Sequence, residues 1–476
     1  MKLTYLALFS GLLLTTTVFG QQHSEQNHSK YIWPKDEAVR QKLGNWQDIK
    51  FGLLMHWGTY SERGIVESWS LCPEDEGWCE RKGPTASNWY EYKKGYEALQ
   101  TTFNPVKFNP DRWAVAAQQA GMKYMIFTTK HHDGFCMFDT KQTDYKITST
   151  KTPFSSNPRS NVTKEILQSF RAKDFMVGTY FSKPDWHTDS YWKPYFPPKD
   201  RNVNYDPKKY PDEWVKFKTF TYNQIQELMT DYGKVDILWL DGGWVRPFST
   251  IDSTVSWQRT IPFDQDIDMA RIAAAARQKQ PGLLVVDRTV SGEFENYVTP
   301  EQQIPDHYMP IPWETCLTMG DSWSYIPKEN FKSARKLVQI LVDVVAKNGN
   351  MLLNIAPGPD GEWHEEAYQR LAQIGNWMQI NSESIYGTKP LAPYRQEQWA
   401  FTSNGQATYA SYLPTEAETV LPVSLTLPVT PTKILTILGS KQPLKWKKAS
   451  NGIVVNVPEK VRQQLANQPV WVFKLT

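Results

Sequence analysis

Short apolar runs alternate with longer amphipathic segments between about residues 48 and 387, and this alternation constrains the fold most strongly. The apolar runs predict strands at 50–58, 123–135, 175–182, 235–243, 283–288, 313–317 and 351–355. The amphipathic segments predict helices at 109–121, 161–174, 212–233, 266–282, 329–350 and 362–387. Strands that alternate with crossover helices form parallel sheets. Seven or eight such units, with no GxGxxG motif after the first strand, favour a (β/α)8-like TIM barrel over an open dinucleotide-binding sheet.

The pattern changes near residue 390. Short runs at 407–413, 424–429, 433–438, 452–457 and 470–475 alternate with Pro and Gly turns, which predicts a C-terminal all-β sandwich. We therefore expect a barrel domain over 35–390 and a β-sandwich over 391–476. Bracing the barrel is the favoured role for the sandwich, ahead of glycan binding, because only Trp399 and Trp446 stand out as candidate exposed aromatics.

The N-terminal segment has the features of a secretory signal. Lys2 precedes an apolar run, and Val18 and Gly20 fit the small-residue positions of a cleavage site before Gln21. We expect a signal peptide over 1–20, a disordered leader over 21–34, and an exported protein, either periplasmic or secreted. No later run is long enough to predict a membrane span.

Composition narrows the class of partner. A net charge of +3 over 476 residues gives no reason to expect nucleic acid. The 20 Trp, 23 Tyr and 21 Phe are typical of large cores, or of a protein that stacks aromatic rings on sugars. The four cysteines are too few for a disulfide scaffold. Cys72 and Cys79 could close a small loop, but buried free thiols are favoured.

Reacting groups in such barrels come from the C-terminal ends of the strands. The residues expected there are His56, His131, His132, Tyr180, Asp241, Arg288 and Asn354. Asp241 ends the apolar run 237–240 and precedes two glycines; it could also be the N-cap of a helix. Two carboxylates that flank an acetal can cleave it, and Asp241 is the first candidate.

The second carboxylate is expected in the polar loop after Arg288. This loop holds Glu293, Glu295 and Glu301, and spacing alone does not decide among them or exclude a solvated loop acid. The three histidines could bind a metal or bond to hydroxyl groups. The second role is favoured, because a metal site needs further ligands at coordinating spacing. We therefore expect no metal and no other cofactor.

Several motifs resemble the α-L-fucosidases of glycoside hydrolase family 29. These are HWG (56–58), TTKHHDGF (128–135), WLDG (239–242) and GNMLLNIAPGPDG (349–361), and the similarity extends from about residue 35 to residue 390. The resemblance implies a retaining exo-α-L-fucosidase that acts on fucosylated oligosaccharides or glycoconjugates without a metal. An enzyme restricted to α-1,3/1,4-linked fucose is an alternative within the family. The sequence does not predict the oligomeric state.

The resemblance also assigns roles to residues. Asp241 resembles the nucleophile and Glu301 the acid/base, with Glu293 and Glu295 as alternatives because this loop varies in length. The positions that bond or pack against fucose are matched by His56, His131, His132, Tyr180, Trp239 and Arg288. Trp69 resembles the Trp of a Glu-Trp pair, although here Ser68 separates it from Glu67. The competing hypotheses are a non-catalytic fucose-binding protein and a metal-dependent barrel hydrolase.

Overall fold

The computed structural model describes residues 30–74, 79–429 and 434–476. The predicted signal peptide and residues 21–29 of the predicted leader lie outside this part of the chain. Lys30 and Tyr31, which were expected in the disordered leader, instead contact the barrel domain: Lys30 Nζ is 2.7 Å from Asp252 and the Tyr31 hydroxyl donates to the Asn296 carbonyl. Among the described residues, no helix combines the length and apolarity that crossing a membrane requires.

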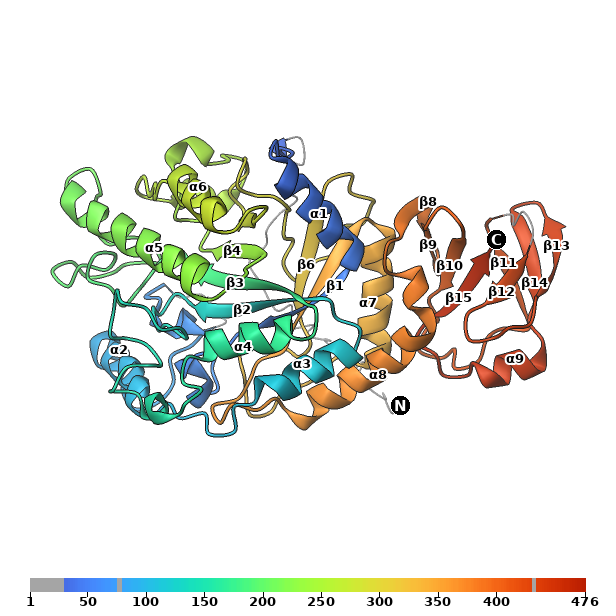
Figure 1. Cartoon of the computed structure of the whole chain (residues 1–476), viewed down its shortest axis with the longest axis horizontal. Helices are drawn as coiled ribbons and strands as arrows, with labels where there is room; N and C mark the ends of the chain where they lie inside the picture. Colours follow the sequence, from blue (N-terminus) through green and yellow to red (C-terminus); the bar gives the residue numbers. More distant parts are fainter. Residues whose placement is uncertain (1–29, 75–78, 430–433) are drawn as a thin grey trace, which may run out of the picture.

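Seven parallel strands form the barrel sheet, in the order β5-β4-β3-β2-β1-β7-β6 (Figure 1). Their bounds are β1 (Phe51–Met55), β2 (Tyr124–Lys130), β3 (Met176–Ser182), β4 (Ile237–Asp241), β5 (Leu284–Asp287), β6 (Trp313–Thr318) and β7 (Gly349–Asn354). Almost every residue in these strands is buried, as expected for parallel strands that are covered on both faces. The predicted barrel architecture is thus confirmed, with seven regular strands.

A closing segment, residues 295–302, fills the gap between β5 and β6. Glu295 pairs with Val286 of β5, while Val298 and Glu301 pair in parallel with Trp313 and Cys316 of β6. The segment therefore occupies the place of an eighth strand, and the expected loop acid Glu301 lies at a strand-like position on the rim.

The helices surround the sheet (Figure 1). Their bounds are α1 (Glu37–Ile49), α2 (Trp89–Glu97), α3 (Pro110–Gln119), α4 (Val162–Arg171), α5 (Pro211–Asp231), α6 (Met269–Lys279), α7 (Ala334–Ala346) and α8 (Glu365–Asn381). Local signals set where they begin: the Asn109 side chain accepts the Arg112 N–H and Pro110 is the first residue of α3. In the inner core, Trp46 of α1 stacks on Tyr297 of the closing segment at 4.0 Å.

The C-terminal domain contains two antiparallel sheets that share one core, which confirms the predicted all-β module. Its elements are β8 (Lys389–Gln396), β9 (Trp399–Ser403), β10 (Thr408–Tyr412), β11 (Ser424–Leu427), β12 (Leu435–Ile437), β13 (Lys445–Ala449), β14 (Gly452–Asn456), α9 (Glu459–Gln464) and β15 (Trp471–Leu475). The domain docks on the outside of the barrel, where the Trp377 indole of α8 donates to the Val470 carbonyl at 2.9 Å. Trp399 is buried and Trp446 is partly exposed.

The four cysteines are free thiols, as predicted. Cys72, Cys136 and Cys316 are buried, and Cys79 is half-buried, with its thiol directed at the Trp69 carbonyl.

Candidate active site

Asp241 ends β4 at the C-terminal mouth of the barrel. Its backbone carbonyl accepts the Lys183 N–H at 2.9 Å, so the strand stays paired up to the carboxylate. Gly242 then turns the chain away with φ +83°, and a Cβ at this position would lie 2.2 Å from Pro184. The glycine is therefore required by both the turn and the close approach.

Three side chains surround the Asp241 carboxylate. Tyr180 donates its hydroxyl to Oδ2 at 2.7 Å, Arg288 Nη1 donates to Oδ1 at 2.9 Å, and His132 Nε2 lies 3.8 Å from Oδ2. Burial by itself raises the pKa of this carboxyl, but the Arg288 charge, then His132 and the Tyr180 bond, outweigh it. The pKa of Asp241 is consequently held well below its ordinary value, and the group is an anion throughout the range in which enzymes work.

Arg288 joins Asp241 to a second carboxyl group. Its Nη2 donates to Glu301 Oε2 at 2.8 Å, and its Nε donates to Thr299 at 3.0 Å. Because one planar guanidinium bonds both carboxylates, the two bonded oxygens lie within roughly 8 Å of each other. That spacing allows both groups to reach one glycosidic bond.

The structure separates the three loop glutamates that the sequence left open. Glu301 is the one that shares Arg288 with Asp241. Glu295 is buried and accepts the Thr289 N–H at 3.0 Å, beside the turn after β5. Glu293 is exposed. Of the three loop glutamates, Glu301 is therefore the one that lies beside Asp241 at the mouth of the barrel.

His56, the residue after β1, is held as a neutral imidazole in one tautomer. Its Nδ1 lies 2.9 Å from Asn354 Oδ1, which can only accept, so Nδ1 carries the hydrogen. Burial lowers the pKa of His56 to about 4, and the Asn354 bond offsets this only in part. The Nε2 lone pair is left available as a hydrogen-bond acceptor.

His131 and His132 follow β2, and both are buried. His131 Nδ1 contacts the Ser68 hydroxyl, which also accepts the Asp133 N–H at 3.0 Å. Burial lowers the pKa of His131 well below its ordinary value and that of His132 to about 4. The two rings lie 4.2 Å apart because the strand ends before them, so these adjacent side chains both lie beside Asp241.

Tryptophan rings form the walls of the mouth. Trp69 meets the His132 ring edge-on at 5.2 Å, and Trp239 stacks on Tyr180 at 5.2 Å. Trp323, which sequence reasoning missed, lies 5.2 Å from the His56 ring, and its carbonyl accepts from Asn354 Nδ2 at 2.7 Å. Its position in the loop after β6 offers no periodicity or strand-end signal.

Glu67 is a third carboxyl group near the site. It is buried, Oε1 has no hydrogen-bond partner among the described residues, and burial followed by the charge of Glu301 raises its pKa well above the ordinary value. Glu67 and Ser68 are thus both part of the mouth, although only Trp69 was expected from this stretch. The only signal for them was adjacency to Trp69.

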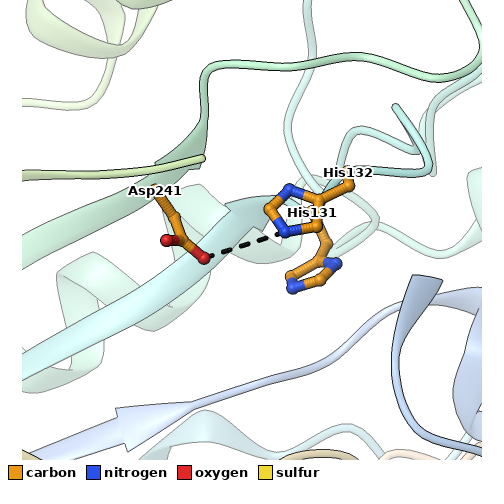
Figure 2. A group of neighbouring side chains, drawn as sticks. All are labelled: His131, His132 and Asp241. Atoms are coloured by element: carbon orange, nitrogen blue, oxygen red, sulfur yellow. Dashed lines mark ion pairs between the residues drawn. The ribbon is translucent and has the colours of Figure 1, made fainter. Parts of the chain in front are cut away.

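One group of side chains is close enough together to hold a metal ion: potential ligand atoms of His131, His132 and Asp241 lie within 4.8 Å of one another (Figure 2). Both Asp241 oxygens already accept strong hydrogen bonds, one of them from the permanently charged Arg288. A cation at this position would face the guanidinium. The donor set therefore fits a metal poorly and suits hydrogen bonds to hydroxyl groups.

A parallel barrel whose mouth presents an anionic carboxylate, a linked second carboxyl group and aromatic walls defines a glycoside hydrolase site. The family model for α-L-fucosidases matches residues 18–383, and the model for the α-L-fucosidase C-terminal domain matches residues 394–476. The chain belongs to the α-L-fucosidase family, as the motifs implied.

Relatives match over nearly the whole chain. The α-L-fucosidase of Branchiostoma floridae is 27% identical over 472 residues, covering 94% of this chain and 96% of that protein. The tissue α-L-fucosidase of Homo sapiens is 27% identical over 482 residues, covering 93% and 91%. The structure of α-L-fucosidase isoenzyme 1 from Paenibacillus thiaminolyticus is 28% identical with a TM-score of 0.72, covering 92% and 99%. A GH29 α-L-fucosidase from Bacteroides thetaiotaomicron, 23% identical with a TM-score of 0.70, has the same fold.

Proposed function

We propose that this glycoside hydrolase removes terminal α-L-fucose from fucosylated glycans by double displacement, with Asp241 as nucleophile and Glu301 as acid/base. The observation that carries the proposal is the Arg288 bridge, which holds the Asp241 carboxylate and the Glu301 carboxyl group beside each other at the mouth of the barrel. Asp241 is already anionic and needs no base to activate it.

In the first step a carboxylate oxygen of Asp241 forms a bond to the anomeric carbon of fucose. The bond from that carbon to the leaving oxygen breaks, and Glu301 gives its proton to the leaving oxygen. In the second step Glu301 takes a proton from water, the water oxygen attacks the anomeric carbon, and Asp241 leaves. Two inversions at one carbon retain its configuration.

The remaining contacts are assigned to the sugar. His56 presents an acceptor nitrogen, and the neutral rings of His131 and His132 lie next to it. Trp69 offers an apolar face to the C–H groups and the methyl group of a 6-deoxy sugar, and the buried Trp239 supports the site from below through Tyr180 and Arg288. Tyr180 and Arg288 bond Asp241 directly and hold it against the anomeric centre.

We further propose that the enzyme is exported after loss of residues 1–20, and that the barrel domain spans 35–390 and the β-sandwich 391–476. Strand β8 begins at Lys389 and the C-terminal family model at residue 394, which supports a boundary in this region. Restriction to α-1,3/1,4-linked fucose is distinguished by a panel of fucosylated oligosaccharides of defined linkage.

The test uses turnover of an aryl α-L-fucoside, with Asp48→Asn on α1 as the matched control. Asp241→Asn is expected to lose turnover by orders of magnitude while fucose still binds, and near-normal turnover would remove Asp241 from the mechanism. Azide is expected to restore turnover in Glu301→Ala. Restoration in a Glu293 or Glu295 variant instead assigns the acid/base there, and fucose binding without turnover by the intact protein favours a lectin.

A further inference from the structure

Glu314 is an acidic residue inside the barrel that the proposed mechanism does not use. It is the second residue of β6 and is fully buried below the mouth. Its Oε2 accepts the Tyr124 hydroxyl of β2 at 2.6 Å, and its Oε1 accepts the Trp239 indole N–H of β4 at 3.3 Å. Both bonded donors are neutral, so no cation bonds this carboxyl group directly.

Four titratable groups face Glu314. They are Tyr124 on β2, Tyr297 on the closing segment, Cys316 on β6 and Arg288 after β5. Burial raises the pKa of Glu314 to about 8, and the hydrogen bonds from Tyr124 and Trp239, with the Arg288 charge, oppose this only in part. Glu314 is therefore a neutral acid at pH 7.

A neutral acid has a place for its proton here. The Tyr124 hydroxyl also lies 3.5 Å from the Met351 carbonyl. The hydroxyl can direct its own hydrogen to that carbonyl and accept the proton of Glu314, while Oε1 still accepts from Trp239. Both Glu314 oxygens, the Tyr124 hydroxyl and the Trp239 indole are then satisfied without a charge. The buried Tyr297 hydroxyl has no hydrogen-bond partner among the described residues.

Trp239 connects this buried acid to the catalytic carboxylate. The Arg288 guanidinium lies 4.4 Å from the Trp239 ring centroid, and the Tyr180 ring stacks on it. Arg288 and Tyr180 are the two groups that donate hydrogen bonds to Asp241. A change in the orientation of the indole therefore reaches both oxygens of the proposed nucleophile.

We propose that Glu314 is a positioning residue, which as a neutral carboxylic acid anchors the Trp239 indole and through it the guanidinium and phenol that bond Asp241. The inference rests on the proposed function of Asp241. Ionisation of Glu314 places a third negative charge near Arg288, in competition with Asp241 and Glu301. Activity then falls as pH rises through the range in which Glu314 ionises.

The test is the ratio of kcat/KM for Glu314→Gln to that of the wild type, measured on an aryl α-L-fucoside from pH 5 to pH 9.5. Glutamine copies the neutral acid, because its oxygen accepts from Trp239 and its NH2 donates to Tyr124. The ratio cancels the pH dependence of all the other groups, which both proteins share. We expect a ratio near one at pH 6 that rises roughly tenfold above pH 8. Glu383→Gln, on the exposed turn after α8, is the matched control and keeps a flat ratio.

Two results overturn the inference: a flat ratio for Glu314→Gln, or a loss of tenfold or more at pH 6 with an unchanged melting temperature. If Glu314→Gln does not fold, Tyr124→Phe is measured instead. Tyr124 donates a hydrogen bond that stabilises the ionised form of Glu314, so its removal should shift the alkaline loss of activity to higher pH. An unchanged pH profile rejects the inference. Asp241→Asn is measured in parallel. Full turnover in that variant rejects the proposed function itself, whereas a flat Glu314→Gln ratio in an active enzyme rejects only the role of Glu314.

Discussion

Replacing Arg288 with methionine removes the charge that links the two carboxyl groups while keeping a side chain of similar length. Arg288 bonds Asp241 at 2.9 Å and Glu301 at 2.8 Å, and only 5% of its side chain is exposed. In the variant, two carboxyl groups face each other in a poorly solvated mouth without a cation. One of them must then hold a proton at neutral pH.

The magnitude follows from the burial of the ion pairs. Removing one partner of a buried pair costs about 3 to 5 kcal/mol. Asp241 and Glu301 keep 21% and 18% of their side chains exposed, so water offsets part of this cost and the lower value applies. Because Asp241 must be ionised to react, the variant carries this cost in the reacting state, and about 3 kcal/mol corresponds to a loss in kcat/KM of roughly two orders of magnitude.

The pH dependence of activity should also change, in a defined direction. In the wild type the pKa of Asp241 lies well below its ordinary value, so the proposed nucleophile stays ionised as pH falls. Without Arg288, burial raises that pKa, and activity is lost on acidification at a higher pH than in the wild type. The assay is kcat/KM against pH for Arg288→Met, with Arg370→Met on α8 as the control. The reasoning is refuted if Arg288→Met loses less than fivefold in kcat/KM and its activity falls on acidification at the same pH as in the wild type.

Three further predictions concern the same mouth. Asn354→Ala removes the hydrogen bond that keeps the hydrogen of His56 on Nδ1. We expect KM for fucosides to rise roughly tenfold with a smaller change in kcat, and an unchanged KM contradicts the tautomer argument. Dialysis against EDTA should leave activity unchanged, because Asp241 is already fully bonded, and a loss that Zn²⁺ restores would support the metal-dependent alternative. His56 and His132 have lowered folded-state pKa values of about 4, so their stabilising contribution is complete above their unfolded pKa of about 6.5. It disappears as pH falls through 4, and melting temperatures from pH 7 to pH 4 should decline less in the His132→Gln variant than in the wild type.

The barrel was predictable because its strands are continuous apolar runs that end in polar residues. Each predicted strand of the barrel is present, and Asp241 and His56 lie where such runs stop. The closing segment was not predictable. Its residues 295–302 lack alternation and an apolar run, and it pairs with β5 and β6 only through isolated bridges that depend on the closed barrel.

The proposed acid/base partner of Asp241 could not be chosen from spacing for the same reason. One polar stretch holds Glu293, Glu295 and Glu301. Two tertiary contacts decide where the carboxyl groups point: Glu295 accepts the Thr289 N–H, and Glu301 pairs with Cys316 of β6. Trp323 was not predictable either, because it reaches the site through contacts with His56 and Asn354, which are distant in the sequence. The resemblance to the family favoured Glu301, but it left Glu293 and Glu295 as alternatives because this loop varies in length.

The central claim is that Asp241 becomes covalently linked to fucose during turnover. An activated 2-fluoro-fucosyl fluoride, which forms the glycosyl-enzyme faster than water removes it, should inactivate the protein stoichiometrically. Peptide mass spectrometry is then expected to find the fluorofucosyl group on the peptide that contains Asp241. A label on Glu301 or Glu67, or an enzyme that turns over fucosides yet never carries the label, contradicts the account.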